Sequence, residues 1–436
     1  MRSLRLLASL AGIVVSAFVP AQTVTEFPLR KPDASAVGIT AGPDGNLWFT
    51  EWTQCCSYIG RLTTAGIITE FQIPTTIHGF FDIAAGPDGN LWFTEWTSSR
   101  VGRITAGGVV TEFPLPDGIT SSGNRIAAGS DGNLWLNAVS SILRVSTAGV
   151  VTVFPQPEGI GIGYGLTSGP DGNLWFTTGG FSIGRITTDG LVTLFPLPTA
   201  DFGAVDITSG PDGNLWFTEG GLGGRYAPPR GRIGRITPAG VVTEFSLPGE
   251  RVPRHIAVGP DGNLWFTEYL GVIGRITTTG AITEFLIPNS PTPGGPYTGI
   301  GPREIVAGPD GNLWFTFDAG GKIGRMTIPS PTDLWLDLGF RADVTWNARS
   351  GGESGNGHAV PITTNTGGFW FFDPTNLELV VKVLDGRSIN GKWWVFYGSL
   401  TNVEFTLTIT DTQTGAVRTY FNPQDQLASV ADTSAF

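Results

Sequence analysis

Charged side chains stand at the start of several short apolar segments, where they could do chemistry if the fold brings them together. His255 and Glu304 are of the types that act as general bases, so they are the candidate catalytic residues. Arginines and aspartates at equivalent positions can bind a polar substrate. These substrate-binding candidates are Arg254, Arg303, Asp82, Asp206 and Arg125.

A second set of carboxylates follows the tryptophan-containing segments. One glutamate comes three residues after the tryptophan in four segments: Glu51, Glu95, Glu219 and Glu268. Asp318 comes four residues after Trp314. Carboxylates that converge at one mouth suit Mg²⁺ or Ca²⁺, which makes Asp318 and Glu268 the candidate metal ligands. The plainer interpretation is that these carboxylates are solvated at a loop rim and that His255 is a surface residue.

A repeat sets the spacing of all these residues. The sequence Gly-Pro-Asp-Gly-Asn-Leu-Trp occurs six times, and a seventh copy has Ser in place of Pro. The spacings between copies run from 40 to 49 residues, which is typical of propeller blades of four strands each. The copies begin at Gly42, Gly86, Gly129, Gly169, Gly210, Gly259 and Gly308.

The second copy shows how the residues make a blade. Residues 81–86 form a short apolar run, and Pro-Asp-Gly after them supplies a tight turn. Residues 91–96, 101–105 and 109–115 are rich in β-branched and aromatic types and predict three further strands. No segment has a sustained 3.6-residue apolar period, so the predicted domain is all-β.

The order of the fourth strands predicts how the ring closes. Seven segments of the type Thr-x-Phe mark these strands, but the first, at Thr25, precedes the first motif and none follows the last. We therefore expect a seven-bladed β-propeller over residues 22–328, in which the N-terminal strand completes the last blade and removes an open sheet edge. Two long insertions, residues 220–232 and 289–302, fall at the face where the candidate residues lie.

Two residue types recur in every copy and are expected to be structural. The tryptophan that ends each motif should pack between blades, since seven copies match the blade symmetry. An arginine in each third strand should brace neighbouring strands, and the glutamates of the Thr-Glu-Phe segments are its candidate partners.

The repeat "GPDGNLWFTE…IGRIT…GVVTEFPLP" resembles that of the virginiamycin B lyase (streptogramin lyase)-like family over about residues 24–327. The resemblance implies opening of a macrocyclic lactone by elimination, in which a base takes the proton α to the ester carbonyl while Mg²⁺ steadies the developing charge. Mg²⁺ is therefore the cofactor that the resemblance implies.

The family's site residues match this chain poorly. The family's base is a His in a Glu-Pro-His-Gly-Ile sequence, and Arg303 stands at that position here. Gly301 stands where the family has a metal-binding Glu, and Arg254 where it has a substrate-contacting His. At the fourth position the family has a second metal-binding carboxylate, and Asp318 stands there in this chain. It is the one position of the four at which the chemical type is kept. Since an arginine stays protonated, Arg303 cannot act as the base.

Two functions follow from these residues. The first is a binding or surface-interaction protein that holds a small molecule, peptide or glycan at the loop face. The alternative is a Mg²⁺-dependent carbon–oxygen lyase with a rearranged site, in which Glu304 or His255 is the base and Asp318 helps to hold the metal. A monomer is expected in either case.

The net charge and the N-terminal segment indicate which partners and which cellular location to expect. The formal net charge is −11 and no Lys/Arg cluster offsets it, which excludes nucleic acid as an expected partner. Residues 1–21 combine an Arg-bearing start, an apolar run and Val-Pro-Ala at the end, as signal peptides do. The run is too short for a comfortable membrane span, so we expect secretion to the periplasm, the cell envelope or the medium.

Residues 329–436 lack the repeat. Their alternating aromatic and β-branched runs, separated by Gly, Asn and Asp turns, predict a small β-sandwich-like domain. The segment resembles a module attached to diverse secreted bacterial proteins. Its residues Trp370, Trp393 and Trp394 either pack in the core or stack on sugars.

Overall fold

A computed structural model provides the structure of the chain. It describes residues 23–31, 34–53, 56–74, 80–95, 99–119, 125–138, 141–156, 161–199, 201–221, 230–248, 251–269, 271–288, 301–318, 320–328, 332–336, 339–348, 352–363, 365–373, 376–412 and 414–436. The segment expected as a signal peptide lies outside the described residues, as do most of the two long insertions. Contacts divide the chain into separate compact units, of which Gln22–Ile328 is one and Pro329–Phe436 belongs to the other.

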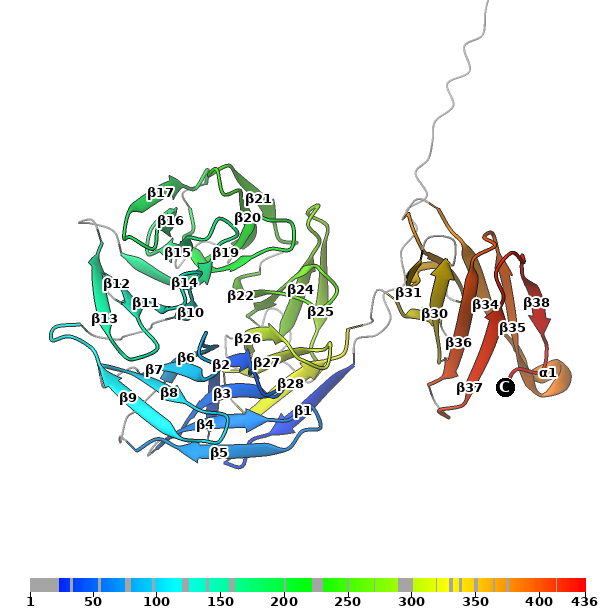
Figure 1. The fold of residues 1–436 in the computed structure, drawn as a ribbon, viewed down its shortest axis with the longest axis horizontal. Helices are drawn as coiled ribbons and strands as arrows, with labels where there is room; N and C mark the ends of the chain where they lie inside the picture. The colour runs from blue at the N-terminus through cyan, green and yellow to red at the C-terminus, as the bar shows by residue number, and fades with distance from the viewer. Residues whose placement is uncertain are drawn as a thin grey trace, which may run out of the picture. The chain divides into compact units, whose positions relative to one another are not determined.

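The first unit is a ring of antiparallel sheets of four strands each (Figure 1). Six of these sheets in the described part of the chain take their strands in sequence order. The first three blades consist of β2 (Ser35–Ala41), β3 (Leu47–Trp52), β4 (Ser57–Leu62) and β5 (Ile68–Gln72); β6 (Phe80–Ala85), β7 (Leu91–Glu95), β8 (Arg100–Ile104) and β9 (Val110–Pro114); and β10 (Ile126–Ala128), β11 (Leu134–Ala138), β12 (Ser141–Val145) and β13 (Val151–Pro155).

The next three blades repeat this order. They consist of β14 (Ile162–Ser168), β15 (Leu174–Thr178), β16 (Ser182–Ile186) and β17 (Val192–Pro196); β18 (Ala204–Ser209), β19 (Leu215–Gly221), β20 (Arg230–Ile236) and β21 (Val242–Ser246); and β22 (Pro253–Val258), β23 (Leu264–Glu268), β24 (Val272–Ile276) and β25 (Ile282–Leu286).

The seventh blade joins the two ends of the propeller. It contains β26 (Pro302–Ala307), β27 (Leu313–Phe317) and β28 (Lys322–Met326), and β1 (Val24–Pro28) supplies its outer strand. β1 pairs antiparallel with β28, from Val24 opposite Met326 to Pro28 opposite Lys322. The sequence prediction of an all-β, seven-bladed propeller closed by its N-terminal strand is therefore confirmed.

The repeated tryptophans pack between blades, as predicted. Trp92 is fully buried, stacks on Phe113 of its own blade at 5.3 Å, and packs against Leu134 of the next blade. Its Nε1 donates a hydrogen bond to Asp88 in the preceding turn, at 3.0 Å, so the buried N–H is paired. The other motif tryptophans make the equivalent stack and hydrogen bond.

Six of the third-strand arginines link one blade to the next rather than pairing with the Thr-Glu-Phe glutamates. The seventh, Arg275, bonds Asp261 of its own blade at 2.7 Å. Arg103 Nη1 donates to the carbonyl oxygen of Thr147 in the next blade at 3.1 Å, and the guanidinium lies 5.6 Å from the centre of the Trp92 ring. Arg325 makes the same bond to Thr64 across the closure of the ring, at 3.1 Å. A backbone carbonyl of the following turn serves six of the arginines whatever residue stands there, whereas Val153 and Leu194 replace the glutamate in two blades.

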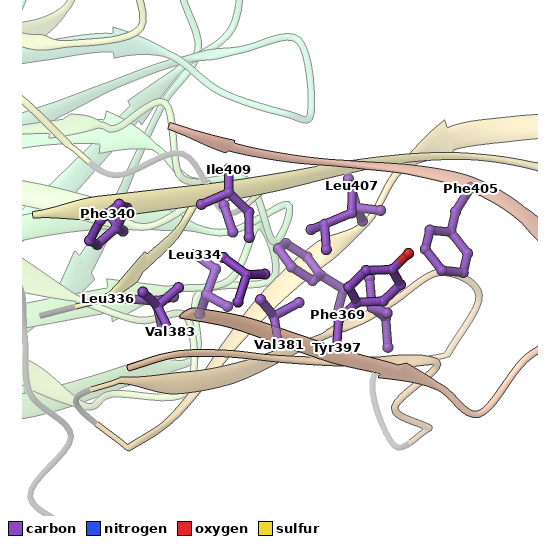
Figure 2. Close-up of a cluster of buried hydrophobic side chains, with 14 of the residues drawn as sticks. Leu334, Leu336, Phe340, Phe369, Val381, Val383, Tyr397, Phe405, Leu407 and Ile409 are labelled. Atoms are coloured by element: carbon purple, nitrogen blue, oxygen red, sulfur yellow. The ribbon is translucent and has the colours of Figure 1, made fainter. Parts of the chain in front are cut away.

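The second unit is a sandwich of two sheets. Figure 2 shows Leu407 and Ile409 of one sheet pointing toward Val381 and Val383 of the other. One sheet contains β29 (Leu334–Leu336), β30 (Phe340–Ala348), β31 (Glu353–Asn356), β36 (Glu404–Asp411) and β37 (Val417–Asn422). The other contains β32 (His358–Thr363), β33 (Thr366–Trp370), β34 (Leu379–Gly386), β35 (Lys392–Ser399) and β38 (Ser429–Asp432), with the short helix α1 (Arg387–Asn390) between β34 and β35.

The tryptophans of the sandwich differ in their surroundings. Trp393 packs against the core and meets Phe340 edge-on at 5.1 Å. Trp370 instead stacks on His358 at 3.9 Å, and Trp394 donates through Nε1 to Asn390. Core packing therefore accounts for Trp393, the first of the two alternatives for these residues.

Phe27→Ala tests the closure of the ring. Phe27 stacks on Trp314 at 5.1 Å, as the fourth-strand phenylalanine does in every other blade. Its loss should destabilise the propeller by about 2–3 kcal/mol, less than for a fully buried phenylalanine because Phe27 is partly buried. Urea denaturation measures this change. Ile67→Ala, at a side chain that is 66% exposed, is the control and should change stability by less than about 0.5 kcal/mol. Equal effects of the two substitutions would contradict the closure.

Candidate functional site

The innermost strand of each blade lines the axis of the propeller. Six of the candidate residues lie in β-bulges of these strands: Asp82, Asp206, Arg254, His255, Arg303 and Glu304. In β22 the register shifts between Pro253 and Ile256, around Arg254 and His255. The shift in β26, between Pro302 and Ile305, surrounds the Arg303–Glu304 pair in the same way. A β-bulge changes the direction of the side chains in its strand, so two successive residues can both lie near the axis.

A repeated threonine holds the bulges in place, and the sequence analysis overlooked it. Glu304 donates its backbone N–H to Thr316 Oγ1 at 3.2 Å, and that hydroxyl donates to the carbonyl of Val37 in the next blade at 2.9 Å. His255, Asp82 and Asp206 make the same amide bond to a threonine twelve residues later. In the third blade Asn137 replaces the threonine and accepts from the amide of Arg125. The recurrence of Thr two residues after six of the seven motif tryptophans was the available signal.

Four of the candidate residues form one ion-pair network on the axis. Arg125 Nη1 lies 2.9 Å from Glu304 Oε1 and 3.2 Å from Asp82 Oδ1, and its Nη2 lies 3.4 Å from Asp206 Oδ1. These carboxylates come from the second, fifth and seventh blades and are each less than 8% exposed. We call Arg125, Asp82, Asp206 and Glu304 the axial network.

Burial and the mutual charges change the pKa values of the groups in the axial network. Desolvation raises the pKa of Glu304 to about 8, although Arg125 opposes this shift. Desolvation likewise raises the pKa of Asp82 and of Asp206, again against Arg125. Burial disfavours the charged form of Arg125, but the three carboxylates outweigh it and raise its pKa.

The same side chains also bind backbone amides of the following blade. Asp82 accepts the N–H of Ile126 at 2.9 Å, Asp206 that of Ile256 at 3.0 Å, and Glu304 that of Ile39 at 3.2 Å. Because these amides are buried, they would otherwise be left without a partner. The axial carboxylates therefore tie the second, fifth and seventh blades each to the blade that follows.

His255 has the same linking role. Its Nδ1 accepts the N–H of Ile305 in the next blade at 3.2 Å, and its Nε2 lies 3.4 Å from Asp206 Oδ2. Burial, with Arg125 and Arg254 nearby, lowers the pKa of His255 well below its ordinary value. The imidazole is thus neutral with its proton on Nε2, and its one lone pair is already engaged.

A second cluster lies one residue nearer the loop face, where each inner strand begins. Arg254 forms an ion pair with Asp318, and Arg303 Nη1 lies 4.0 Å from the other oxygen of that carboxylate. The Arg254 guanidinium also lies 4.4 Å from the centre of the Tyr269 ring. Burial lowers the pKa of Arg303, and the neighbouring arginines add to this effect while Glu304 and Asp318 oppose it. We call Arg254, Arg303 and Asp318 the mouth cluster.

Glu268 belongs to a different cluster from Asp318. It is fully buried beside Glu284, and Arg251 Nε lies 3.7 Å from Glu268 and 2.9 Å from Glu284. The four glutamates that lie three residues after a motif tryptophan were expected to be solvated at a loop rim, and this expectation is wrong. All four are fully buried: Glu51, Glu95, Glu219 and Glu268.

The residues present do not offer Mg²⁺ a suitable set of ligands. Asp318 faces two guanidinium groups, which compete with a cation for its oxygens, and Gly301 contributes no side chain. Within the described ranges, no group of three or more His, Cys, Asp or Glu residues is arranged to hold a metal ion.

Fold and site together define a seven-bladed β-propeller with an ion-paired axis and a charged mouth. The sequence pattern of the virginiamycin B lyase family matches residues 8–225 and 226–335. The chain belongs to this family. Among curated proteins, none matches the chain.

Solved structures agree with the family. A streptogramin B lyase is 33% identical, with 70% of this chain and 97% of that chain covered at a TM-score of 0.61. The virginiamycin B lyase of Staphylococcus aureus is 32% identical, with 70% and 99% covered at the same TM-score. A catalytically inactive His-to-Ala variant of the latter has been solved with quinupristin. The extracellular domain assigned to a hybrid two-component system of B. thetaiotaomicron is 11% identical, with 91% and 58% covered and a TM-score of 0.54, and shares the fold alone.

Glu268→Gln tests the buried protonation of this glutamate. Burial and the charge of Glu284 raise the pKa of Glu268 from 4.5 to about 8. Between these values the folded chain keeps a proton that the unfolded chain releases, so stability falls as the pH rises. In the Glu268→Gln variant, stability should fall less steeply with pH than in the wild type. The difference in slope should be up to about 1.4 kcal/mol per pH unit.

Urea denaturation at several pH values in this window measures the difference. Glu353→Gln, at an exposed glutamate of the sandwich, is the control and should leave the pH dependence unchanged. Parallel pH profiles for wild type and Glu268→Gln would show that Glu268 is ionised in the folded state.

Proposed function

We propose that this chain is an exported ligand-binding member of the virginiamycin B lyase family that does not catalyse the family's elimination reaction. The observation that carries the proposal is the mouth cluster. The position that the family resemblance gives to the base holds Arg303, and the one retained metal-type carboxylate, Asp318, is ion-paired with Arg254.

The loss of the histidine bears directly on catalysis. A His-to-Ala change makes the S. aureus lyase catalytically inactive. A protonated guanidinium cannot remove a proton, so Arg303 cannot replace an imidazole in that role. The candidates for a substitute base, His255 and Glu304, have their acceptor atoms bound to Ile305, Ile39 and Arg125.

The same mouth is suited to binding. Its charged groups are held by neighbouring side chains, so little conformational entropy is lost when a ligand binds them. Tyr164 occupies the equivalent position of the fourth blade, directly before Gly165, whose amide donates to the repeated threonine. The Tyr164 side chain is 62% exposed and offers an aromatic surface at the corresponding level of the fourth blade.

Incubation with quinupristin, a streptogramin B, tests the absence of lyase activity. With Mg²⁺ present, mass spectrometry and chromatography should find only the cyclic compound after a time in which the S. aureus lyase converts it completely. A linear product of unchanged mass would establish elimination and overturn the proposal. A linear product that has gained one water would indicate hydrolysis and would also overturn it.

Export is part of this proposal. The composition of residues 1–21 supports a cleaved signal peptide, and in the described part of the chain no helix is long and apolar enough to cross a membrane. Cleavage after Ala21 would leave β1 whole, since this strand begins at Val24. Expression of the full chain in a bacterial host should therefore give a mature N-terminus at about Gln22 by mass spectrometry, and an intact Met1 in the folded product would contradict export.

A further inference from the structure

The mouth cluster carries more positive than negative charge. Arg254 and Arg303 supply two guanidinium groups, and Asp318 is the carboxylate between them. The layer beneath, the axial network, has its own arginine and three carboxylates. A cationic layer therefore faces the loop side, although the chain as a whole has a formal charge of −11.

We propose that Arg254 and Arg303 bind an anionic group of the ligand, a carboxylate or a phosphate, in competition with Asp318. The inference rests on the proposed binding function and names the ligand chemistry of that site. In the absence of ligand, Asp318 acts as an internal counterion. When an anion binds, both guanidinium groups donate hydrogen bonds to it in place of Asp318.

The position of Asp318 shows that one carboxylate can be reached from both arginines. Its contact with Arg254 is close, whereas its contact with Arg303 is 4.0 Å long and beyond hydrogen-bond distance. A guanidinium has five N–H donors in a planar fork that matches carboxylate and phosphate oxygens. The Asp318 carboxylate thus leaves the donors of Arg303 incompletely used.

Burial makes this arrangement costly without a ligand. Burial lowers the pKa of Arg303, and the charges of Arg254 and Arg125 act in the same direction. A cation destabilised in this way gains when an additional anion approaches it. Arg303 remains 31% exposed at its side chain, so an anion can reach it from solvent.

Two aromatic residues add to the proposed site, one by contact with Arg254 and the other by its exposed position in the fourth blade. The Tyr269 ring lies against the guanidinium of Arg254 at 4.4 Å, which holds its plane in place. Tyr164, 62% exposed at the equivalent position of the fourth blade, can pack against the body of a ligand whose anionic group is bound by the arginines. The ligand class is therefore a molecule with one anionic group and an apolar or ring-containing body.

Calorimetric titration of the full chain tests the inference, with inorganic phosphate and benzoate as the probes at constant ionic strength in chloride. Wild type should bind at least one probe saturably, and the stronger of the two identifies the source of the anion. Arg303→Gln should weaken that binding about tenfold, the loss expected for a charge-assisted hydrogen bond.

Asp318→Asn separates anion binding from a structural role. Removal of the internal competitor should tighten binding of the same probe about tenfold, whereas a merely structural ion pair would give no gain in affinity. Arg387→Gln, at an exposed arginine of the sandwich, is the matched control and should leave affinity unchanged. Circular dichroism confirms the fold of each variant, and Asp318→Asn keeps the test decisive if Arg303→Gln does not fold.

Two results would overturn the inference. One is the lack of saturable binding of either probe by wild type and Asp318→Asn. The other is binding with an affinity that neither substitution in the mouth cluster changes. Either result leaves the absence of lyase activity standing, since the quinupristin assay decides that separately. Conversely, quinupristin opening together with tighter anion binding by Asp318→Asn would overturn the proposed function and leave the anion site intact.

Discussion

Seven sheets that meet on one axis bury the amides of their innermost strands, and each of these amides needs a partner. At four boundaries between blades, this chain meets the requirement with side chains of the bulges, which accept hydrogen bonds from amides of the next blade. Asp82, Asp206, Glu304 and, through Nδ1, His255 all do so. Arg125 then joins the three carboxylates at the centre. The residues that looked most capable of chemistry are thus committed to holding the ring together.

Much of the fold could be predicted from sequence because the same pattern of strands and turns recurs seven times. The position of Thr25 before the first motif was enough to predict that β1 completes the seventh blade, which the pairing with β28 confirms. The partners of the third-strand arginines could not be predicted in this way. Arg103 bonds a backbone carbonyl of the next blade, and a carbonyl leaves no trace in residue identity.

Prediction of the site succeeded in part, for a physical reason. The sequence placed Asp82, Arg125, Asp206 and Glu304 at equivalent positions of different blades, and the structure joins them. It could not distinguish a side chain that reaches the mouth from one that turns between blades. Glu268 follows a strand in the same way that Asp318 does, yet it is buried beside Glu284 and Arg251.

The family fold is therefore kept while the residues at its mouth have changed character. Arg254 and Arg303 introduce fixed positive charge where the family resemblance implies histidines, and Asp318 is the counterion of both. A rigid, cationic mouth favours binding of an anion over removal of a proton, because guanidinium groups stabilise negative charge but cannot accept hydrogen. The sandwich has a core of its own and belongs to the other compact unit.

The central claim, that the axial charges hold the blades together, is tested most directly by a double-mutant cycle between Arg125→Met and Glu304→Gln. Urea denaturation at a pH above the Glu304 pKa of about 8, where this carboxyl is ionised, gives the stability of the wild type, the two single variants and the double variant. The account predicts a coupling energy of at least about 1 kcal/mol, since each substitution removes the other's partner. Additive effects, with a coupling energy below about 0.5 kcal/mol, would show that the network does not stabilise the ring and would contradict the account.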